Sequence, residues 1–174
     1  MSDERKPPKK TNRARSWLIY GSLFFVVFMA VSTIQTRNLL EGPAPEFEAF
    51  TLAGPYFSLK ERRGEPLIVH FWATWCPVCK AEEGTINSLA EDADIITIAM
   101  QSGDHAEVAK HMRDRELKFP VIVDEDGSLS RQYRVRGVPT TYILDSNGEI
   151  RFSDVGFATE AGLRARYWLA KEAD

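Results

Sequence analysis

Cysteine is scarce in this chain, whose 174 residues include only Cys76 and Cys79. Two cysteines separated by two residues close a very small loop, so a bridge between them removes little entropy from the unfolded chain. A scaffold held together by disulfides is therefore excluded. The chain is also long enough to bury a hydrophobic core without disulfide bonds. A chemical role therefore explains the cysteine pair better than a structural role does.

Other signatures of bound groups are missing as well. No Gly-rich fingerprint follows an apolar run, and no Cys-x-x-Cys-His occurs, so nothing indicates a nucleotide, flavin or haem site. The three histidines, at positions 70, 105 and 111, are scattered. Zinc sites need two further Cys or His ligands at recognisable spacing. We therefore expect no resident metal and no cofactor.

Basic residues are in the minority outside the N-terminal segment. Residues 1–37 hold seven Lys/Arg and two Asp/Glu, whereas the rest of the chain holds fifteen basic and twenty-three acidic residues. Nucleic acids select basic surfaces, so we expect no nucleic-acid partner. The hydrophobic share of 44% and the charged share of 27% are typical of a globular domain.

One long apolar run, residues 17–34, follows six basic side chains within residues 1–16. Eighteen helical residues reach ~27 Å, close to the ~30 Å thickness of a bilayer's hydrocarbon core. Trp17 and Tyr20 stand where interfacial aromatic residues are expected, and the basic flank predicts a cytoplasmic N-terminus. The sequence therefore predicts a cytoplasmic segment over 1–16, one transmembrane helix over 17–34 in the inner membrane, and a periplasmic remainder.

A cleaved signal peptide is the alternative for this run. Signal peptides usually have a shorter apolar region of ~7–15 residues before a cleavage site made of small residues. Ala30 and Ser32 would have to supply that site here.

The remaining chain reads as a linker over 35–46 and one domain over 47–174. Short extended pieces are expected between 47 and 59, and a hairpin around Asn147-Gly148. Strands alternating with helices predict an α/β fold with a mixed central sheet flanked by helices. The expected strands are 67–72, 95–100, 121–123, 140–144 and 150–152, and the expected helices are 77–90, 104–115, 128–133 and 159–171. The inward positions expected on the first helix are Val78, Ile86, Leu89 and Ala90.

The two cysteines follow a predicted strand and open a predicted helix. A helix N-terminus has unpaired N–H groups and partial positive charge, which stabilise a thiolate placed there. Pro77 suits the first helical turn, where an N–H is not needed. A spacing of three puts both sulfur atoms on one side of the helix. We predict that Cys76 is the exposed attacking thiol and Cys79 the resolving thiol.

Two segments resemble the thioredoxin superfamily closely. Residues 71–80 read Phe-Trp-Ala-Thr-Trp-Cys-Pro-Val-Cys-Lys, similar to the family's active-site segment, and residues 137–140 read Gly-Val-Pro-Thr, similar to its cis-proline loop. The resemblance covers residues 43–172 and implies a thioredoxin-like fold. It further implies that Pro139 is cis and faces the cysteines, and that Val138 and Pro139 present backbone to an extended substrate. Trp75 is then expected on the apolar rim of the site.

Within the superfamily, the chain is most similar to the membrane-anchored TlpA/ScsD-type periplasmic disulfide oxidoreductases. A basic residue and Glu82 follow the second cysteine as in that branch, although Glu82-Glu83-Gly84 departs from its commoner Glu-x-Pro. The branch is associated with cytochrome c maturation, copper tolerance and repair of protein disulfides. The resemblance implies protein thiol and disulfide substrates and a membrane electron donor of the DsbD kind.

His70 and Glu82 are the candidates for proton transfer. His70 stands where thioredoxin has a buried aspartate, and an imidazole can relay protons near neutral pH. It can equally be a hydrogen-bonded core histidine. For Glu82 the alternative is an ordinary glutamate on a helix surface.

The function predicted from these features is that of a thiol–disulfide oxidoreductase, acting as a reductase. A periplasmic oxidant or a disulfide-shuffling enzyme is the alternative, because the two residues between the cysteines only partly determine the reduction potential. A Cu(I)-binding protein that uses the same dithiol is less favoured. The chain lacks the Met/His-rich tracts that are expected of a copper carrier.

Overall fold

The computed structural model describes residues 19–23 and 39–172. Residues 19–23 are helical and belong to a unit that is separate from residues 38–174 in its contacts. Among the described residues, no helix is both long and apolar enough to cross a membrane. The predicted segments 1–16 and 17–34 lie wholly or mostly outside the described residues and remain predictions.

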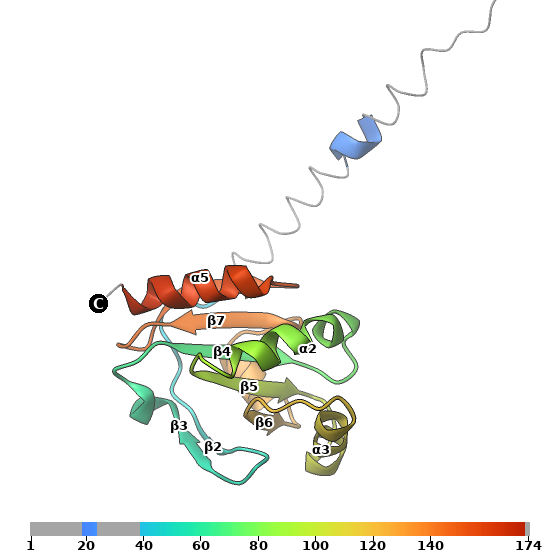
Figure 1. Cartoon of the computed structure of the whole chain (residues 1–174), viewed down its shortest axis with the longest axis vertical. Helices are drawn as coiled ribbons and strands as arrows, with labels where there is room; N and C mark the ends of the chain where they lie inside the picture. The colour runs from blue at the N-terminus through green and yellow to red at the C-terminus, as the bar shows by residue number, and fades with distance from the viewer. Residues whose placement is uncertain (1–18, 24–38, 173–174) are drawn as a thin grey trace, which may run out of the picture. The chain divides into compact units, whose positions relative to one another are not determined.

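Residues 39–172 form an α/β domain (Figure 1). Its strands are β1 (Gly42–Pro43), β2 (Glu48–Phe50), β3 (Tyr56–Ser58), β4 (Leu67–Trp72), β5 (Ile95–Met100), β6 (Val121–Asp124), β7 (Thr140–Leu144) and β8 (Glu149–Val155). Its helices are the short 3-10 helix η1 (Leu59–Arg62), α2 (Pro77–Leu89), α3 (His105–Asp114), α4 (Ser128–Gln132) and α5 (Glu160–Lys171). Every strand and helix predicted after residue 47 is present, within a few residues of its expected bounds.

Six strands form the central sheet in the order β1-β8-β7-β4-β5-β6, and β2 and β3 form a separate hairpin. Strands β4, β5 and β6 run parallel, whereas β7 and β8 are antiparallel to their neighbours. The mixed sheet is therefore confirmed. All six residues of β4 are buried, as expected for a central strand covered on both faces.

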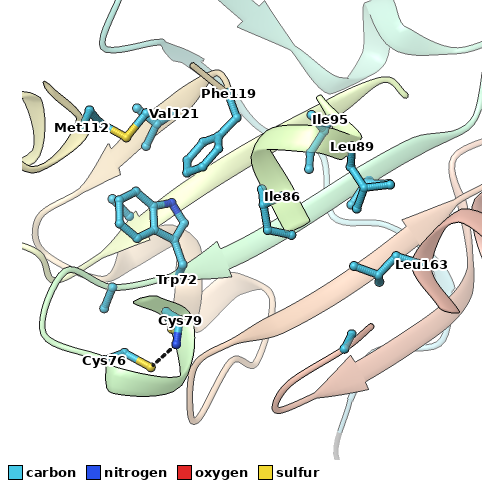
Figure 2. Close-up of a cluster of buried hydrophobic side chains, with 14 of the residues drawn as sticks. Trp72, Cys76, Cys79, Ile86, Leu89, Ile95, Met112, Phe119, Val121 and Leu163 are labelled. Carbon is cyan, nitrogen blue, oxygen red and sulfur yellow. Dashed lines mark hydrogen bonds between the residues drawn. The ribbon is translucent and has the colours of Figure 1, made fainter. Parts of the chain in front are cut away.

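Alternate residues of β4 enter two separate cores. Ile68 and Trp72 pack with the inner faces of α2, α3 and α5 (Figure 2). Val69 and Phe71 pack on the other face, against the β2–β3 hairpin and Tyr133, which follows α4. Because β4 is fixed from both sides, the loop that leaves its carboxyl end starts from a rigid support.

Two expectations need correction. The predicted linker over 35–46 contributes β1, which pairs with β8, and the buried residue Ala44, so the folded unit starts before Phe47. Val78 was expected to face inward, but it is 43% exposed because it lies on the outer side of the first turn of α2.

The Asn-Gly turn predicted between β7 and β8 is present. Gly148 has φ of +75°, and a Cβ atom there would collide with the guanidinium of Arg63. The Asp145 side chain accepts hydrogen bonds from the backbone N–H groups of Asn147 and Glu149. This turn joins β7 to β8, which leads through residues 156–159 into α5.

Candidate active site

The cysteine pair lies where β4 passes into α2. Cys76 is the N-cap residue of α2, and its Sγ accepts a hydrogen bond from the backbone N–H of Cys79 at 3.2 Å (Figure 2). Pro77 occupies the first turn, where no N–H is needed. An N–H group that has no partner within the helix therefore points at the Cys76 sulfur, as the sequence predicted.

The loop before β7 closes over this sulfur. The Val138–Pro139 peptide bond is cis, which confirms the expectation drawn from the resemblance. The Cys76 thiol donates a hydrogen bond to the carbonyl oxygen of Val138 at 3.4 Å. Residues 62 positions apart in the sequence are thus in direct contact at the site.

The prediction that Cys76 is exposed is wrong for this dithiol state. Cys76 is 3% exposed and Cys79 2%. The Cys76 sulfur is turned toward the Cys79 N–H and lies under the Val138 carbonyl, which together remove it from solvent. Near it, the large apolar side chains Trp75 and Val78 are exposed, at 56% and 43%.

Trp75 is held in place although it is exposed. Its indole N–H donates to the carbonyl oxygen of Gln101 at 3.1 Å. The preceding N–H, of Thr74, donates to the hydroxyl of Ser102 at 3.1 Å. The loop after β5 therefore fixes the ring at the rim, the position that the resemblance implies. Trp72, by contrast, is fully buried and donates to Thr97 at 3.1 Å.

Glu82 is fully buried on α2 and is not a surface glutamate. Its Oε1 accepts the backbone N–H of Ala158 at 3.0 Å, whereas Oε2 has no hydrogen-bond partner. Burial raises the pKa of Glu82 to about 7, the Ala158 hydrogen bond opposes this shift, and the charge of Asp154 adds to it. A carboxyl group with such a pKa can both accept and release a proton near neutral pH.

The Cys79 thiol has a raised pKa. Burial raises its pKa most, the hydrogen bond with Cys76 raises it further, and the charge of Glu82 also contributes. Ionising Cys79 therefore requires a nearby acceptor. Glu82, one turn further along α2, is electrostatically linked to this thiol.

His70 is placed as a core histidine. It is 2% exposed, and its Nδ1 is hydrogen-bonded to Oγ1 of Thr141 on β7 at 2.9 Å. Burial lowers the pKa of His70 to about 3, so the ring is neutral at physiological pH. A neutral imidazole with a lone threonine partner gives little support to a proton relay.

Glu83 was not singled out by the sequence. It is buried, and its two oxygens contact Nε2 of His111 at 2.6 Å and Nε of Arg115 at 2.7 Å. Arg115 also donates to the Lys80 carbonyl oxygen at 3.1 Å, so α3 is tied to the first turns of α2. In the sequence, Glu83 stands at the variable position of Glu-x-Pro, so no local signal pointed to it. Within residues 19–23 and 39–172, no group of three or more His, Cys, Asp or Glu side chains is arranged to hold a metal ion.

Comparison with known proteins agrees with this geometry. Residues 40–153 match the model of the AhpC/TSA family. The chain is 33% identical over 123 residues to the thioredoxin-like protein YneN of Bacillus subtilis (strain 168), which covers 67% of this chain and 72% of that protein. It is 31% identical over 159 residues to the thiol:disulfide interchange protein DsbE of Pseudomonas fluorescens biotype C, which covers 84% of this chain and 88% of that protein.

Among solved structures, the chain is similar to a putative thiol:disulfide interchange protein DsbE from Chlorobium tepidum. The TM-score is 0.68 at 24% identity, over 76% of this chain and 98% of the other. At that identity the likeness supports the fold, which is a thioredoxin-like mixed sheet flanked by helices.

Proposed function

The chain belongs to the AhpC/TSA family and is a thioredoxin-like thiol–disulfide oxidoreductase, and we propose that it acts as a reductase of protein disulfides. We further propose that it does so in the periplasm, anchored in the inner membrane. The Cys76/Cys79 dithiol is its redox centre. The anchor and the location rest on residues 1–34 of the sequence, in which basic side chains precede an apolar run.

The site supports a two-step exchange. The Cys76 thiolate attacks one sulfur of a substrate disulfide, forms a mixed disulfide and expels the other substrate sulfur as a thiolate. Cys79 then gives its proton to Glu82 and attacks the Cys76 sulfur, which releases the second substrate thiolate. Two electrons have passed to the substrate, and the enzyme holds a Cys76–Cys79 disulfide.

The observation that carries the reductase direction is the lack of a cation at the sulfur atoms. Among the described residues 39–172, no lysine, arginine or protonated histidine forms a hydrogen bond or an ion pair with Cys76 or Cys79. Burial and the Glu82 charge further disfavour a Cys79 thiolate. Strong oxidants of this fold are oxidising because their reduced form is stabilised. In this site no cation adds to the stabilisation that the N-terminus of α2 gives to the reduced form. Such a site favours its own disulfide more than a strong oxidant does and therefore gives electrons away.

The exposed rim indicates how a substrate is held. Trp75 and Val78 form an apolar edge beside Cys76, and Val138 is half-buried at the start of the cis-proline loop. An extended substrate segment can pair with backbone of Val138 and Pro139 while its side chains contact Trp75. This arrangement suits an unfolded or flexible protein segment that carries a disulfide.

Each turnover leaves the enzyme oxidised, so the proposal requires an electron donor. The resemblance to anchored periplasmic enzymes favours a membrane donor of the DsbD kind. Such a donor would form its own mixed disulfide with Cys76 at the same rim.

The reduction potential of the full-length chain tests the direction. We expect a value near that of thioredoxin, roughly −270 mV, when the chain is equilibrated against thiol–disulfide buffers. A value near that of DsbA, roughly −120 mV, would reverse the assignment and make the protein an oxidant or a shuffling enzyme. A Cys79→Ser chain, which cannot form the internal disulfide, serves as the control.

A further inference from the structure

A small recess opens where β8 passes into α5. Its volume is about 250 Å³, and its lining includes Asp154, Ala158, Thr159 and Arg166. The Asp154 carboxylate and the Arg166 guanidinium form an ion pair at 2.5 Å, with side chains that are 30% and 36% exposed. The recess is therefore lined by a partly exposed charged pair as well as by Ala158.

Ala158 connects this recess to Glu82. The residue lines the recess, and its backbone N–H donates to Oε1 of Glu82 at 3.0 Å. Oε2 of the same carboxyl group is buried without any partner. A buried carboxyl oxygen normally either carries a proton or meets a water molecule. One residue, Ala158, thus both lines the recess and contacts the carboxyl group of Glu82.

Turnover requires a route of this kind. In the proposed exchange Glu82 takes a proton from Cys79 and must then lose it before the next cycle. The Glu82 side chain has no exposed surface of its own, so the proton has to leave through a neighbouring opening.

The titratable and charged groups around Glu82 come from three elements. Cys79 shares α2 with it, Asp154 approaches from β8, and Arg166 on α5 pairs with Asp154. His70 on β4 is neutral. The Asp154 charge raises the pKa of Glu82, which places the two carboxylates within electrostatic range of each other.

We propose that the recess is the route by which Glu82 exchanges protons with solvent, and that the Asp154–Arg166 pair at its mouth controls this exchange. Asp154 and Arg166 are then positioning residues that act through Glu82. This inference rests on the proposed role of Glu82 as the proton acceptor of Cys79.

The test uses the full-length chain, reduced and purified in detergent, and the chromogenic disulfide dithionitrobenzoate as substrate. Attack by Cys76 releases one coloured thiolate, and attack by Cys79 on the mixed disulfide releases the second. The rate of the second phase, followed against pH, reports the proton acceptor of Cys79. In the unmodified chain we expect an inflection near neutral pH.

The two partners of the ion pair should shift that inflection in opposite directions. Asp154→Asn removes a negative charge and leaves Arg166 unpaired, so the inflection should move to lower pH by roughly half a unit or more. Arg166→Met leaves Asp154 unpaired, so the inflection should move to higher pH by a similar amount. Asp92→Asn, which breaks another ion pair of α5, should leave the inflection in place.

The outcomes separate the inference from the function on which it rests. Glu82→Gln should abolish the inflection, and if it does not, Glu82 is not the acceptor and the proposed function itself is wrong on that point. If Glu82→Gln abolishes the inflection but Asp154→Asn and Arg166→Met shift it in the same direction or not at all, the pair only fastens β8 to α5 and the inference is overturned.

Discussion

Among single residues, Glu82 shows how burial links the site to stability. The pKa of Glu82 is raised from 4.5 to about 7 in the folded chain. A carboxyl group whose pKa rises on folding stabilises the protein below its unfolded pKa, and this contribution is lost as the pH rises through the folded pKa. We therefore expect the free energy of unfolding to fall by about 3 kcal/mol between pH 4.5 and about pH 8 on account of this one group.

Urea denaturation of the unmodified chain and of Glu82→Gln at a series of pH values checks this expectation. Gln can still accept the Ala158 hydrogen bond, but it has no charge to desolvate. The difference in stability between the two chains should change sharply across this pH range and be smallest at acidic pH. A constant difference would show that Glu82 does not titrate near neutral pH in the folded chain.

His70 is expected to have no part in proton transfer. Because burial lowers its pKa to about 3, the ring does not change charge in the range where thiols react. His70→Ala should leave the pH dependence of cysteine alkylation unchanged, although loss of a buried side chain should lower stability by about 2–4 kcal/mol. A shifted alkylation profile in a variant that remains folded would restore the relay hypothesis.

At this scale, the sequence could predict which residues carry the chemistry but not their exposure. Cys76, Cys79 and the cis-proline loop lie in short segments whose spacing is informative in itself. The burial of Cys76 depends on the Val138 carbonyl group. The burial of Glu82 depends on the fold, which brings Ala158 into contact with it. These contacts join residues 62 and 76 positions apart, so the local sequence cannot predict them.

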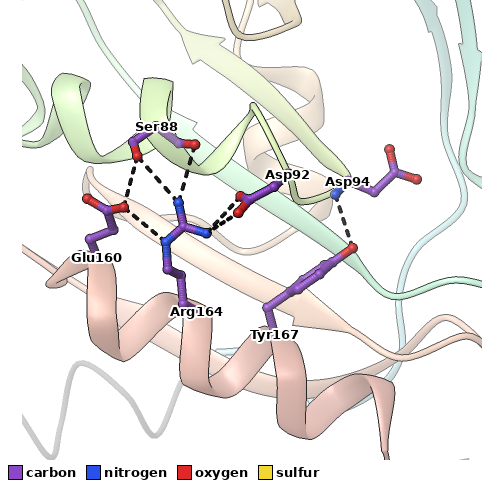
Figure 3. A network of polar contacts seen from close by, with 6 residues as sticks. All are labelled: Ser88, Asp92, Asp94, Glu160, Arg164 and Tyr167. Atoms are coloured by element: carbon purple, nitrogen blue, oxygen red, sulfur yellow. Dashed lines mark hydrogen bonds and ion pairs between the residues drawn. The ribbon is translucent and has the colours of Figure 1, made fainter.

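At the scale of elements, α2 is held from two sides. Figure 3 shows one of them, where Arg164 on α5 contacts Glu160, Asp92 and Ser88, the last of these near the end of α2. Tyr167 of α5 accepts the backbone N–H of Asp94 just before β5. These side chains are partly solvated, so this attachment orients α5 more than it stabilises the fold.

The second attachment of α2, through Glu83, is buried and should matter more. Glu83→Ala leaves His111 and Arg115 without their partner and empties a buried position. We expect a loss of about 2 kcal/mol in unfolding free energy, below the value for a fully buried pair because Arg115 is 46% exposed. Chemical denaturation measures it. Lys110→Ala, which breaks an exposed pair on α3, is the matched control and should change stability very little. Equal effects of the two variants would contradict this reading.

Elements with strong local signals were predicted well. The helix predicted over 104–115 is one of them, and it begins with a capping box in which the Asp104 side chain accepts the Glu107 N–H and the Asp104 N–H donates to the Glu107 side chain. The strand β1 was missed because Gly42-Pro43 has the composition of a linker. Its place in the sheet comes from pairing with β8, more than a hundred residues downstream.

At the scale of the whole molecule, the sequence divides the chain into two parts of unlike charge and hydropathy. The division at residue 37 in the contacts coincides with the end of the basic, apolar segment. The folded unit that follows is acidic and carries both cysteines and the cis-proline loop, and the role proposed for the preceding segment is location.

The last prediction concerns that location. If residues 17–34 form an uncleaved anchor with residues 1–16 in the cytoplasm, the full-length chain should stay in the membrane pellet after alkaline carbonate washing. Protease added to spheroplasts should then digest the folded domain and spare a tag placed before Met1, because basic residues remain on the cytoplasmic side. The mass of the chain recovered from purified membranes is the second readout, and it should correspond to all 174 residues.

A shorter chain that begins near Thr33 and is washed from the membrane would show that the segment is a cleaved signal peptide. In that case the thiol chemistry would stand, but the enzyme would diffuse freely to its substrates and to its electron donor.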